Sequence, residues 1–376
     1  MSAKRLAFAV LALAVAYGAF HVSHRQAPSQ DVESALLYPQ LLEQLNEARK
    51  VTIALPTERI NLVRAGDGWV LADRDNFPVA SAQVKELLMQ IAAFRIREAK
   101  TSKPENYASL GVEDLSTPSS GARQVSVLDA GDKPLADLLL GKERKAKGAD
   151  SPAHFVRRAG EAGSWLVEGD LTLKTKRNDW LDINIVNVAV ERVRKSSLLN
   201  EGEPPVVVAK STPREQLFTL QDIPAGKEAR SIALVSNVGG LLLDMRFEDV
   251  AAASKVAGLS PRRTAVVETF DGLVATLKQY EVDGKRWASF SFAYRPEAAV
   301  APPPAAATGK EGNSAEGKTA DDGKTEAVDV ATEVKSLNEK TAPWVYQLPD
   351  YKLRTLEKSL ADLTKPKDKR PPPPAE

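Results

Sequence analysis

The chain has 376 residues, with 51 lysines and arginines against 50 aspartates and glutamates, and a formal net charge of +1. This balance argues against nucleic-acid binding, which needs a clustered basic surface. The absence of cysteine excludes disulfides, thiol nucleophiles and cysteine-ligated zinc. Three histidines leave few residues for imidazole catalysis or metal binding. We therefore expect no cofactor, no metal and no catalytic residue.

The N-terminal segment is the first predicted element. Residues 6–22 are almost wholly apolar and follow Lys4 and Arg5. A run of about 17 residues lies at the lower limit for spanning a bilayer. An uncleaved signal anchor and a cleaved secretory signal both have this pattern, but Ala16-Tyr17-Gly18 is a poor cleavage site because the apolar run continues past it. We predict a single-pass anchor over residues 1–24. The basic start places the N-terminus in the cytoplasm and the bulk of the chain in the periplasm of a bacterium.

Residues 25–187 are predicted to form a first α+β unit. Alternating apolar residues predict strands at 51–55 and 59–63, and Asp67-Gly68 predicts a hairpin turn before Trp69. Ser81 is a candidate N-cap for a helix with one apolar stripe. A meander of four strands is expected to follow, at residues 124–128, 135–140, 154–158 and 164–168.

Residues 188–295 repeat this succession in diverged form. Strand patterns at 205–210 and 216–220 precede an imperfect helical stripe over 229–244, interrupted by Gly239-Gly240. Strand patterns then return at 264–270, 273–281 and 286–294. The predicted fold class is therefore α+β, with two tandem related units of antiparallel hairpins and meander, each with one packed helix.

The composition changes after this second unit. Residues 296–326 are rich in Ala, Pro, Gly and Lys and predict a disordered linker, and residues 366–376 predict a disordered tail. Residues 327–365 read as a helical and aromatic docking segment, in which Asp350 is expected to cap one continuous helix up to Leu363. Its apolar residues are expected either to dock back on the folded chain or to bind a partner. The candidate docking residues are Trp344, Tyr346, Leu353 and Leu356.

Three patterns suggest catalytic or nucleotide chemistry, and the sequence context argues against each. Residues 312–319 match the phosphate-loop pattern but lie in the linker, without a preceding buried strand, so we expect no nucleotide binding. His154 has Ser151 and Ser164 nearby in sequence, but no nucleophile elbow surrounds either serine, and we expect His154 at a strand edge. Five carboxylates could supply a glycosidase pair, but their spacing does not select one. They are Asp179, Asp182, Asp244, Glu248 and Asp249.

The aromatic residues of the hairpins have a different interpretation. Trp69, Trp165 and Trp287 each lie on the return strand of a predicted hairpin. Because large aromatic side chains dominate burial in small units, we interpret all three as core residues.

An ordered series of short motifs resembles a bacterial family of membrane-anchored proteins of unknown function, encoded beside gliding-motility-type ABC transporter components. The series covers most of residues 36–365, and its order is more specific than any single motif. The first half contributes Tyr38-Pro39, Gly68 to Leu71, Phe77 to Val79, Lys100 to Tyr107, Leu110-Gly111, Leu140 to Lys142, Phe155 to Arg157, Trp165 to Val167 and Asp179 to Leu181. The second half contributes Phe247 to Val250, Phe270 to Leu273 and Trp344 to Pro349.

The resemblance implies an exported, single-span accessory protein beside an ABC permease or auxiliary subunit, and it supplies no catalytic residues. Our leading interpretation is a non-enzymatic scaffold in the inner membrane that binds a protein or an envelope polymer. Two alternatives remain open from the sequence. A periplasmic envelope hydrolase would need acidic side chains or His154 in one cleft, and a tethered solute-binding subunit would need a closed apolar pocket.

Overall fold

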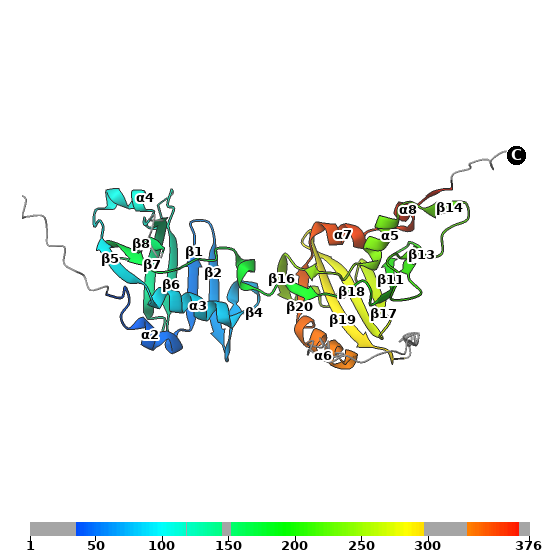
Figure 1. Ribbon diagram of the computed structural model, residues 1–376, viewed down its shortest axis with the longest axis horizontal. Helices are drawn as coiled ribbons and strands as arrows, with labels where there is room; N and C mark the ends of the chain where they lie inside the picture. The colour runs from blue at the N-terminus through cyan, green and yellow to red at the C-terminus, as the bar shows by residue number, and fades with distance from the viewer. Residues whose placement is uncertain (1–34, 118, 145–151, 297–328, 368–376) are drawn as a thin grey trace, which may run out of the picture. The chain divides into compact units, whose positions relative to one another are not determined.

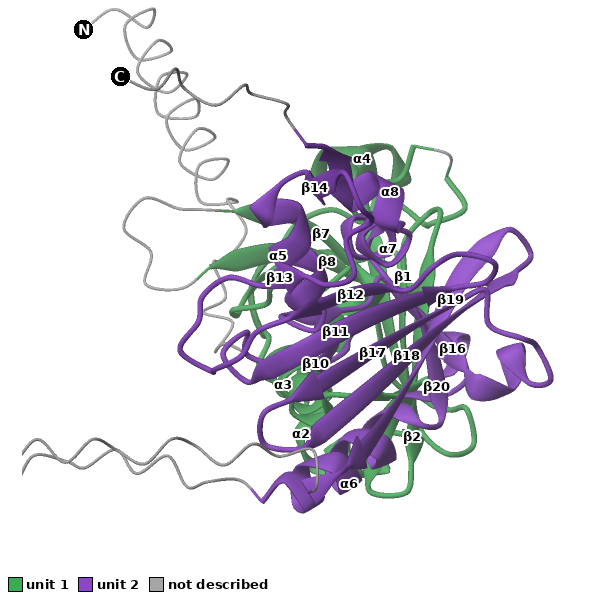
Figure 2. Ribbon diagram, turned by 90° about the vertical axis from the view of Figure 1, so that its right-hand side faces the viewer, with its two compact units in different colours: residues 1–71, 78–180 green, residues 72–77, 181–376 purple. Residues whose placement is uncertain are grey.

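The computed structural model describes residues 35–117, 119–144, 152–296 and 329–367. It confirms an α+β fold with two large antiparallel sheets and few helices (Figure 1). Two compact units divide the chain. Unit 1 contains residues up to Leu71 and Pro78–Trp180, and unit 2 contains Ala72–Phe77 and the chain from Leu181 onward (Figure 2).

The segments predicted to form the membrane anchor, the linker and the C-terminal tail lie mostly outside the described residues. These include the predicted anchor over residues 6–22 and the phosphate-loop match at 312–319. Within the described ranges, no helix has both the length and the apolar character needed to cross a bilayer.

Unit 1 is built on a nine-stranded sheet in the order β4-β3-β2-β1-β6-β7-β8-β9-β5. The ladder from β3 through β9 to β5 is antiparallel throughout. The strands are β1 (Lys50–Ala54), β2 (Arg59–Ala65), β3 (Gly68–Leu71), β4 (Phe77–Val79), β5 (Arg95–Ala99), β6 (Arg123–Leu128), β7 (Pro134–Arg144), β8 (Ala153–Arg158) and β9 (Ser164–Glu168). The helices are α2 (Leu41–Gln44), α3 (Ser81–Ala92) and α4 (Tyr107–Leu110), with short 3-10 turns between strands.

Helix α3 is amphipathic as predicted, because its apolar residues recur every three or four positions. Val84, Leu87, Leu88 and Ile91 are all at most 4% exposed. The prediction that Ser81 caps this helix is wrong. Ser81 is the first helical residue, and its hydroxyl oxygen accepts the Trp69 backbone N–H of β3 at 3.2 Å. The side chain therefore ties the helix to the sheet.

Unit 2 is built on an eight-stranded antiparallel sheet in the order β13-β12-β11-β17-β18-β19-β20-β16. Two small antiparallel ladders, β10 with β15 and β14 with β21, accompany it. The main strands are β11 (Val193–Asn200), β12 (Val206–Ala209), β13 (Thr219–Leu220), β16 (Asp249–Ala252), β17 (Arg263–Thr269), β18 (Leu273–Val282), β19 (Lys285–Tyr294) and β20 (Trp344–Gln347). The minor strands are β10 (Asn184–Val186), β14 (Lys227–Ala229), β15 (Met245–Arg246) and β21 (Thr364–Pro366).

Helix α5 and the helix predicted from Asp350 are shorter than the apolar stripes that predicted them. Helix α5 covers Ile232–Gly239, and α6 covers Val330–Thr341. The continuous helix predicted from Asp350 is instead two helices, α7 (Asp350–Leu356) and α8 (Leu360–Leu363). Ser359 forms a reciprocal capping box with Asp362, which starts α8 and interrupts the stripe. Asp350 makes no cap, because Pro349 occupies the N-cap position.

The two large sheets have the same strand order. From β3 to β5 the order in unit 1 is β3-β2-β1-β6-β7-β8-β9-β5, and unit 2 has β13-β12-β11-β17-β18-β19-β20-β16. Each strand of one series takes the place of its counterpart in the other, and α3 and α5 occupy the same place along the chain. The counterpart of β9 is β20, which enters the sheet only after the linker and α6. The segment after residue 327 is therefore part of unit 2, whose sheet does not end at residue 295.

Candidate functional site

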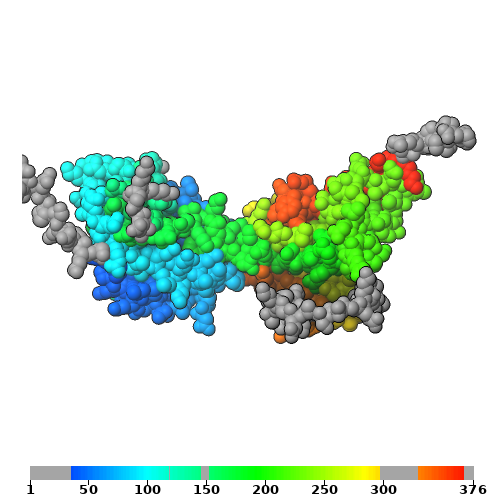
Figure 3. All heavy atoms as spheres, viewed as in Figure 1, coloured from blue at the N-terminus to red at the C-terminus, as the bar shows by residue number. Residues whose placement is uncertain are grey.

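The four candidate docking residues lie within unit 2. Tyr346, Leu353 and Leu356 are at most 4% exposed, and Trp344 is half-buried. Strand β20 pairs with β16 along its whole length and meets β19 at Tyr346. In the space-filling view the orange atoms of α7 cover part of the surface of unit 2 (Figure 3). These residues are thus packed against the rest of unit 2. Another protein would reach them only if the segment that carries them left the sheet.

Aromatic rings surround β20 on the inside of unit 2. The Tyr346 ring lies 5.3 Å from Phe247 and 5.9 Å from Phe290 between centroids, and Trp344 lies 4.8 Å from Phe77, which belongs to unit 2. Burial raises the pKa of the Tyr346 hydroxyl above its usual range, and the charge of Asp182 acts in the same direction. This cluster is a packed core, so it offers no stacking platform for a ligand.

Several motif residues of the first half converge around α4. Arg157 is 3% exposed, and its guanidinium lies 4.5 Å from the centroid of the Tyr107 ring. The guanidinium donates to the carbonyl oxygens of Val112 (2.9 Å) and Glu161 (3.0 Å) and to the Asp114 carboxylate (2.6 Å). A buried arginine with such partners is a structural tie, because its donors are taken up by the chain itself.

A close backbone approach completes this cluster. A Cβ atom on Gly141 of β7 would lie 2.3 Å from the carbonyl oxygen of Leu110, so only glycine fits there. Gly111 ends α4 in the left-handed conformation with φ of 71°, and Lys142 donates to the carbonyl oxygen of Ser109 at 2.8 Å. The motifs Leu110-Gly111 and Leu140-Gly141-Lys142 thus hold α4 against the sheet.

His154 is not at a strand edge, contrary to the expectation from its alternating pattern. It lies in β8 between β7 and β9 and is 4% exposed. Burial lowers the pKa of its imidazole, while Glu143 on the neighbouring strand acts against this shift. The Ser164 hydroxyl donates to the carbonyl oxygen of Thr101 at 2.7 Å and accepts its N–H at 3.1 Å. Ser164 is therefore engaged with the backbone, and Ser151 lies outside the described residues.

Three of the five candidate carboxylates each form an ion pair with a different basic side chain. Asp182 pairs with Lys340 at 2.8 Å, Asp244 pairs with Arg246 at 2.9 Å, and Asp249 pairs with Arg74. In the described part of the chain, no group of three or more acidic or histidine side chains is placed to hold a metal ion. Of the three tryptophans interpreted as core residues, Trp69 and Trp287 are buried, and Trp165 is half-buried beneath the Arg158 guanidinium.

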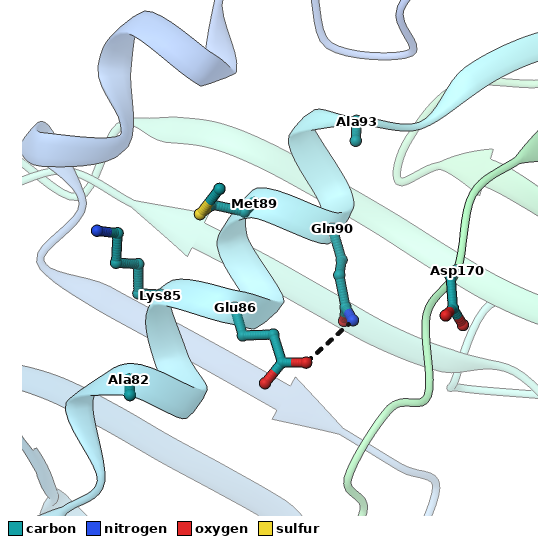
Figure 4. Close-up of a pocket in the computed structure, with 7 residues that line it drawn as sticks. All are labelled: Ala82, Lys85, Glu86, Met89, Gln90, Ala93 and Asp170. Atoms are coloured by element: carbon teal, nitrogen blue, oxygen red, sulfur yellow. Dashed lines mark hydrogen bonds between the residues drawn. The ribbon is translucent and has the colours of Figure 1, made fainter.

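The outward side of α3 in unit 1 borders a hollow of about 510 Å³ (Figure 4). Its centre is apolar, because Ala82, Met89 and Ala93 lie along one side of the helix, and Met89 is 48% exposed. Figure 4 shows Glu86 and Gln90 pointing toward the segment that carries Asp170. The hollow is therefore an apolar strip with a polar rim.

A second hollow of about 290 Å³ adjoins the first, since both are lined by Glu86, Gln90 and Asp170. It adds Lys174 and Trp180 from the segment after β9. We call the two together the α3 groove. Sequence reasoning missed it, although one signal was available: Ala82, Met89 and Ala93 recur at helical spacing on the side opposite the buried stripe.

The fold defines an α+β protein with two large antiparallel sheets. A family model described as a domain of unknown function, DUF4340, matches residues 69–262, which is just over half of the chain. The chain belongs to this family. The matched stretch begins in β3 and ends just before β17, so it contains parts of both units. No curated protein and no solved structure matches the chain.

Proposed function

We propose that this protein is a membrane-anchored, extracytoplasmic scaffold that binds a partner protein through the α3 groove. The observation that carries the proposal is the apolar strip around Met89, which lies at the surface between the charged side chains of Lys85, Glu86 and Asp170. An apolar centre with a polar rim is the composition of protein interfaces. Half-exposed methionine also adapts well to the shape of a partner.

The sheet edges favour a groove over strand addition as the binding mode. The outer side of β5 is bonded to the residues that precede α2, where the Ile96 N–H donates to the carbonyl oxygen of Ala35 at 2.8 Å. At the edge of unit 2, Asp75 accepts the Ala252 N–H of β16 at 2.8 Å. The remaining edges are the two-residue β13 and the three-residue β4, which contains Pro78. Such edges are poor templates for another strand.

The proposed partner is a permease or auxiliary subunit of an ABC-type transporter. Two features support this choice: the apolar N-terminal run that would anchor the chain in the same membrane, and the resemblance to proteins encoded beside such transporters. An envelope hydrolase has less support, because Ser164 bonds to the backbone and three of the candidate carboxylates, Asp182, Asp244 and Asp249, form ion pairs.

Site-specific crosslinking in cells tests the proposal. A photoreactive amino acid at position 89 is expected to capture a transporter subunit, and Met89→Asp is expected to weaken co-purification about tenfold or more, because a charge would face the apolar centre of the interface. Leu217 of unit 2 is a matched control, since it is 52% exposed and lies outside the groove.

Equal capture from positions 89 and 217 would contradict binding through the α3 groove. Capture at position 89 of an envelope protein unrelated to transport would retain the groove and overturn the transporter assignment.

A further inference from the structure

Unit 2 contains a separate polar hollow of about 290 Å³, at the start of β17, the end of β18 and the start of β19. Its lining includes Arg262, Arg263, Gln279, Arg286 and, from the residue after α7, Glu357. Arginines are unusually frequent for so small a space.

The strand register places these side chains on one face of the sheet. Arg263 is directly opposite Gln279, and Glu281 is directly opposite Arg286. Gln279 and Glu281 are two residues apart on β18, so their side chains point to the same face. The hollow is therefore formed by neighbouring side chains of three adjacent strands.

The charges of the hollow are only partly balanced. Arg286 forms ion pairs with two carboxylates, because its Nη1 lies 2.9 Å from Glu357 and its Nη2 lies 3.1 Å from Asp350. Among the described residues, no carboxylate lies within ion-pair distance of Arg262 or Arg263. Among the described lining residues, two guanidinium groups, those of Arg262 and Arg263, have no salt bridge. One lining carboxylate, that of Glu281, also has none within the described chain. The hollow has an excess of positive charge.

Two buried polar atoms in the lining have no partner in the described chain. Gln279 is 3% exposed, and its Oε1 forms no hydrogen bond. The Nε of Arg263, its cross-strand neighbour, is buried and also has no hydrogen-bond partner. Buried polar groups in folded proteins are nearly always hydrogen-bonded, and an unmade bond is costly. Both atoms belong to side chains that line the same hollow, which places two incompletely bonded polar side chains at its wall.

We propose that this hollow binds the oxyanion group, a carboxylate or a phosphate, of a small organic anion. Arg262 and Arg263 would donate N–H bonds to the anionic oxygens, since guanidinium groups match the planar or tetrahedral oxygens of such groups. Gln279 would bond a neighbouring polar group of the ligand. A volume of about 290 Å³ exceeds that of a bare anion and leaves space for the organic part.

Titration calorimetry on the full-length chain tests this assignment, with inorganic phosphate and acetate as probes. Binding of at least one probe is expected, and Arg262→Gln and Arg263→Gln should each weaken it about tenfold or more, because each removes a charge-assisted hydrogen bond. Lys278→Gln is the matched control, because it removes the same charge from an exposed residue of β18 next to Gln279. It should leave the affinity unchanged.

The absence of binding of both probes, or equal weakening by all three substitutions, would overturn the proposal. If Arg263→Gln does not fold, Arg262→Gln carries the test, because Arg262 is exposed. Vesicles of phosphatidylglycerol identify the source of the group: competition with phosphate indicates a lipid headgroup, and no competition indicates a soluble anion.

Discussion

At the scale of single residues, Lys352 shows how the tertiary structure changes the chemistry of a side chain. Lys352 lies on α7 and is 7% exposed. Its ammonium group donates to the carbonyl oxygens of Leu241 (2.8 Å) and Leu243 (2.7 Å), in the turns that follow α5. Carbonyl groups just beyond a helix end have no hydrogen-bond donor within the helix. The ammonium group of Lys352 supplies the missing donors. Burial lowers the pKa of Lys352 to about 8, while Asp244 opposes the shift.

This residue makes the stability of unit 2 dependent on pH in the alkaline range. A free lysine has a pKa of about 10.4, so between about pH 8 and pH 10 the unfolded chain binds more protons than the folded chain. Stability from this residue therefore rises with pH across that window. We expect the free energy of unfolding of the wild type, relative to Lys352→Met, to increase by up to about 3 kcal/mol from pH 7.5 to pH 10.5.

Urea unfolding at several pH values measures this difference. Lys278→Met is the control, because Lys278 is exposed and its substitution should leave the pH dependence as in the wild type. A constant difference between wild type and Lys352→Met would show that the lysine is protonated equally in both states.

At the scale of elements, α6 is a helix that takes the place of a strand. The Asn338 side chain accepts the Phe292 backbone N–H at 2.9 Å and donates to the Phe292 carbonyl oxygen at 2.8 Å. This is the pair of bonds that a neighbouring strand would make with β19. Glu333 anchors the other end of α6 by two bonds to the Arg192 guanidinium, at 2.9 and 2.7 Å.

We expect Asn338→Ala to lower the free energy of unfolding of unit 2 by about 1–3 kcal/mol, because two backbone groups of a half-covered strand lose their partners. The sharper measurement is hydrogen exchange at the Phe292 amide, which should become much faster. Lys335→Ala on the same helix is the control, since the ion pair of Lys335 with Glu339, at 4.0 Å, is exposed and contributes little. Unchanged protection of Phe292 in Asn338→Ala would mean that α6 does not protect this strand.

At the scale of the whole molecule, unit 2 depends on a strand that follows the linker. Strand β20 lies between β19 and β16 and covers Phe247 and Phe290 through Tyr346. A chain that ends at residue 326 should therefore lose amide protection in β16, β18 and β19 but keep it in β6, β7 and β8 of unit 1. Hydrogen exchange with mass spectrometry resolves these peptides. A chain that ends at Lys367 is the control, and protected β19 peptides in the shorter chain would contradict the prediction.

The membrane topology remains a prediction from residues 1–24. An alkaline phosphatase fused after Glu376 should be active in cells, because the basic N-terminus predicts export of the rest of the chain. The protein should stay in the membrane after carbonate extraction if the segment is an uncleaved anchor. Deletion of residues 6–22 should abolish phosphatase activity, and an active cytosolic fluorescent fusion at Glu376 would contradict export.

Most of the longer strands and helix α3 were predictable from the sequence alone, whereas β4, β5 and β16 have no counterpart among the predicted strands. Alternation such as that of Val51 and Ile53 indicates a strand, and helical spacing such as that of Val84, Leu88 and Ile91 indicates a helix. Both patterns can be read from residues that are close together in the sequence. The α+β class follows from these local patterns. The repeated succession of elements was readable for the same reason. The ends of α5 and the interruption between α7 and α8 were not predicted, because the ends of a helix depend on capping side chains and on tertiary contacts.

What only the tertiary structure decided was which segments meet. No local pattern places β20 beside β19, about 50 residues earlier in the chain, and loop entropy changes too slowly with length to mark the partner. The α3 groove and the hollow near Arg263 exist because distant segments leave space between side chains. The burial of Lys352 and Arg157 likewise depends on neighbours remote in sequence. Composition and periodicity describe a residue and its near neighbours, whereas sites and altered pKa values arise from contacts across the fold.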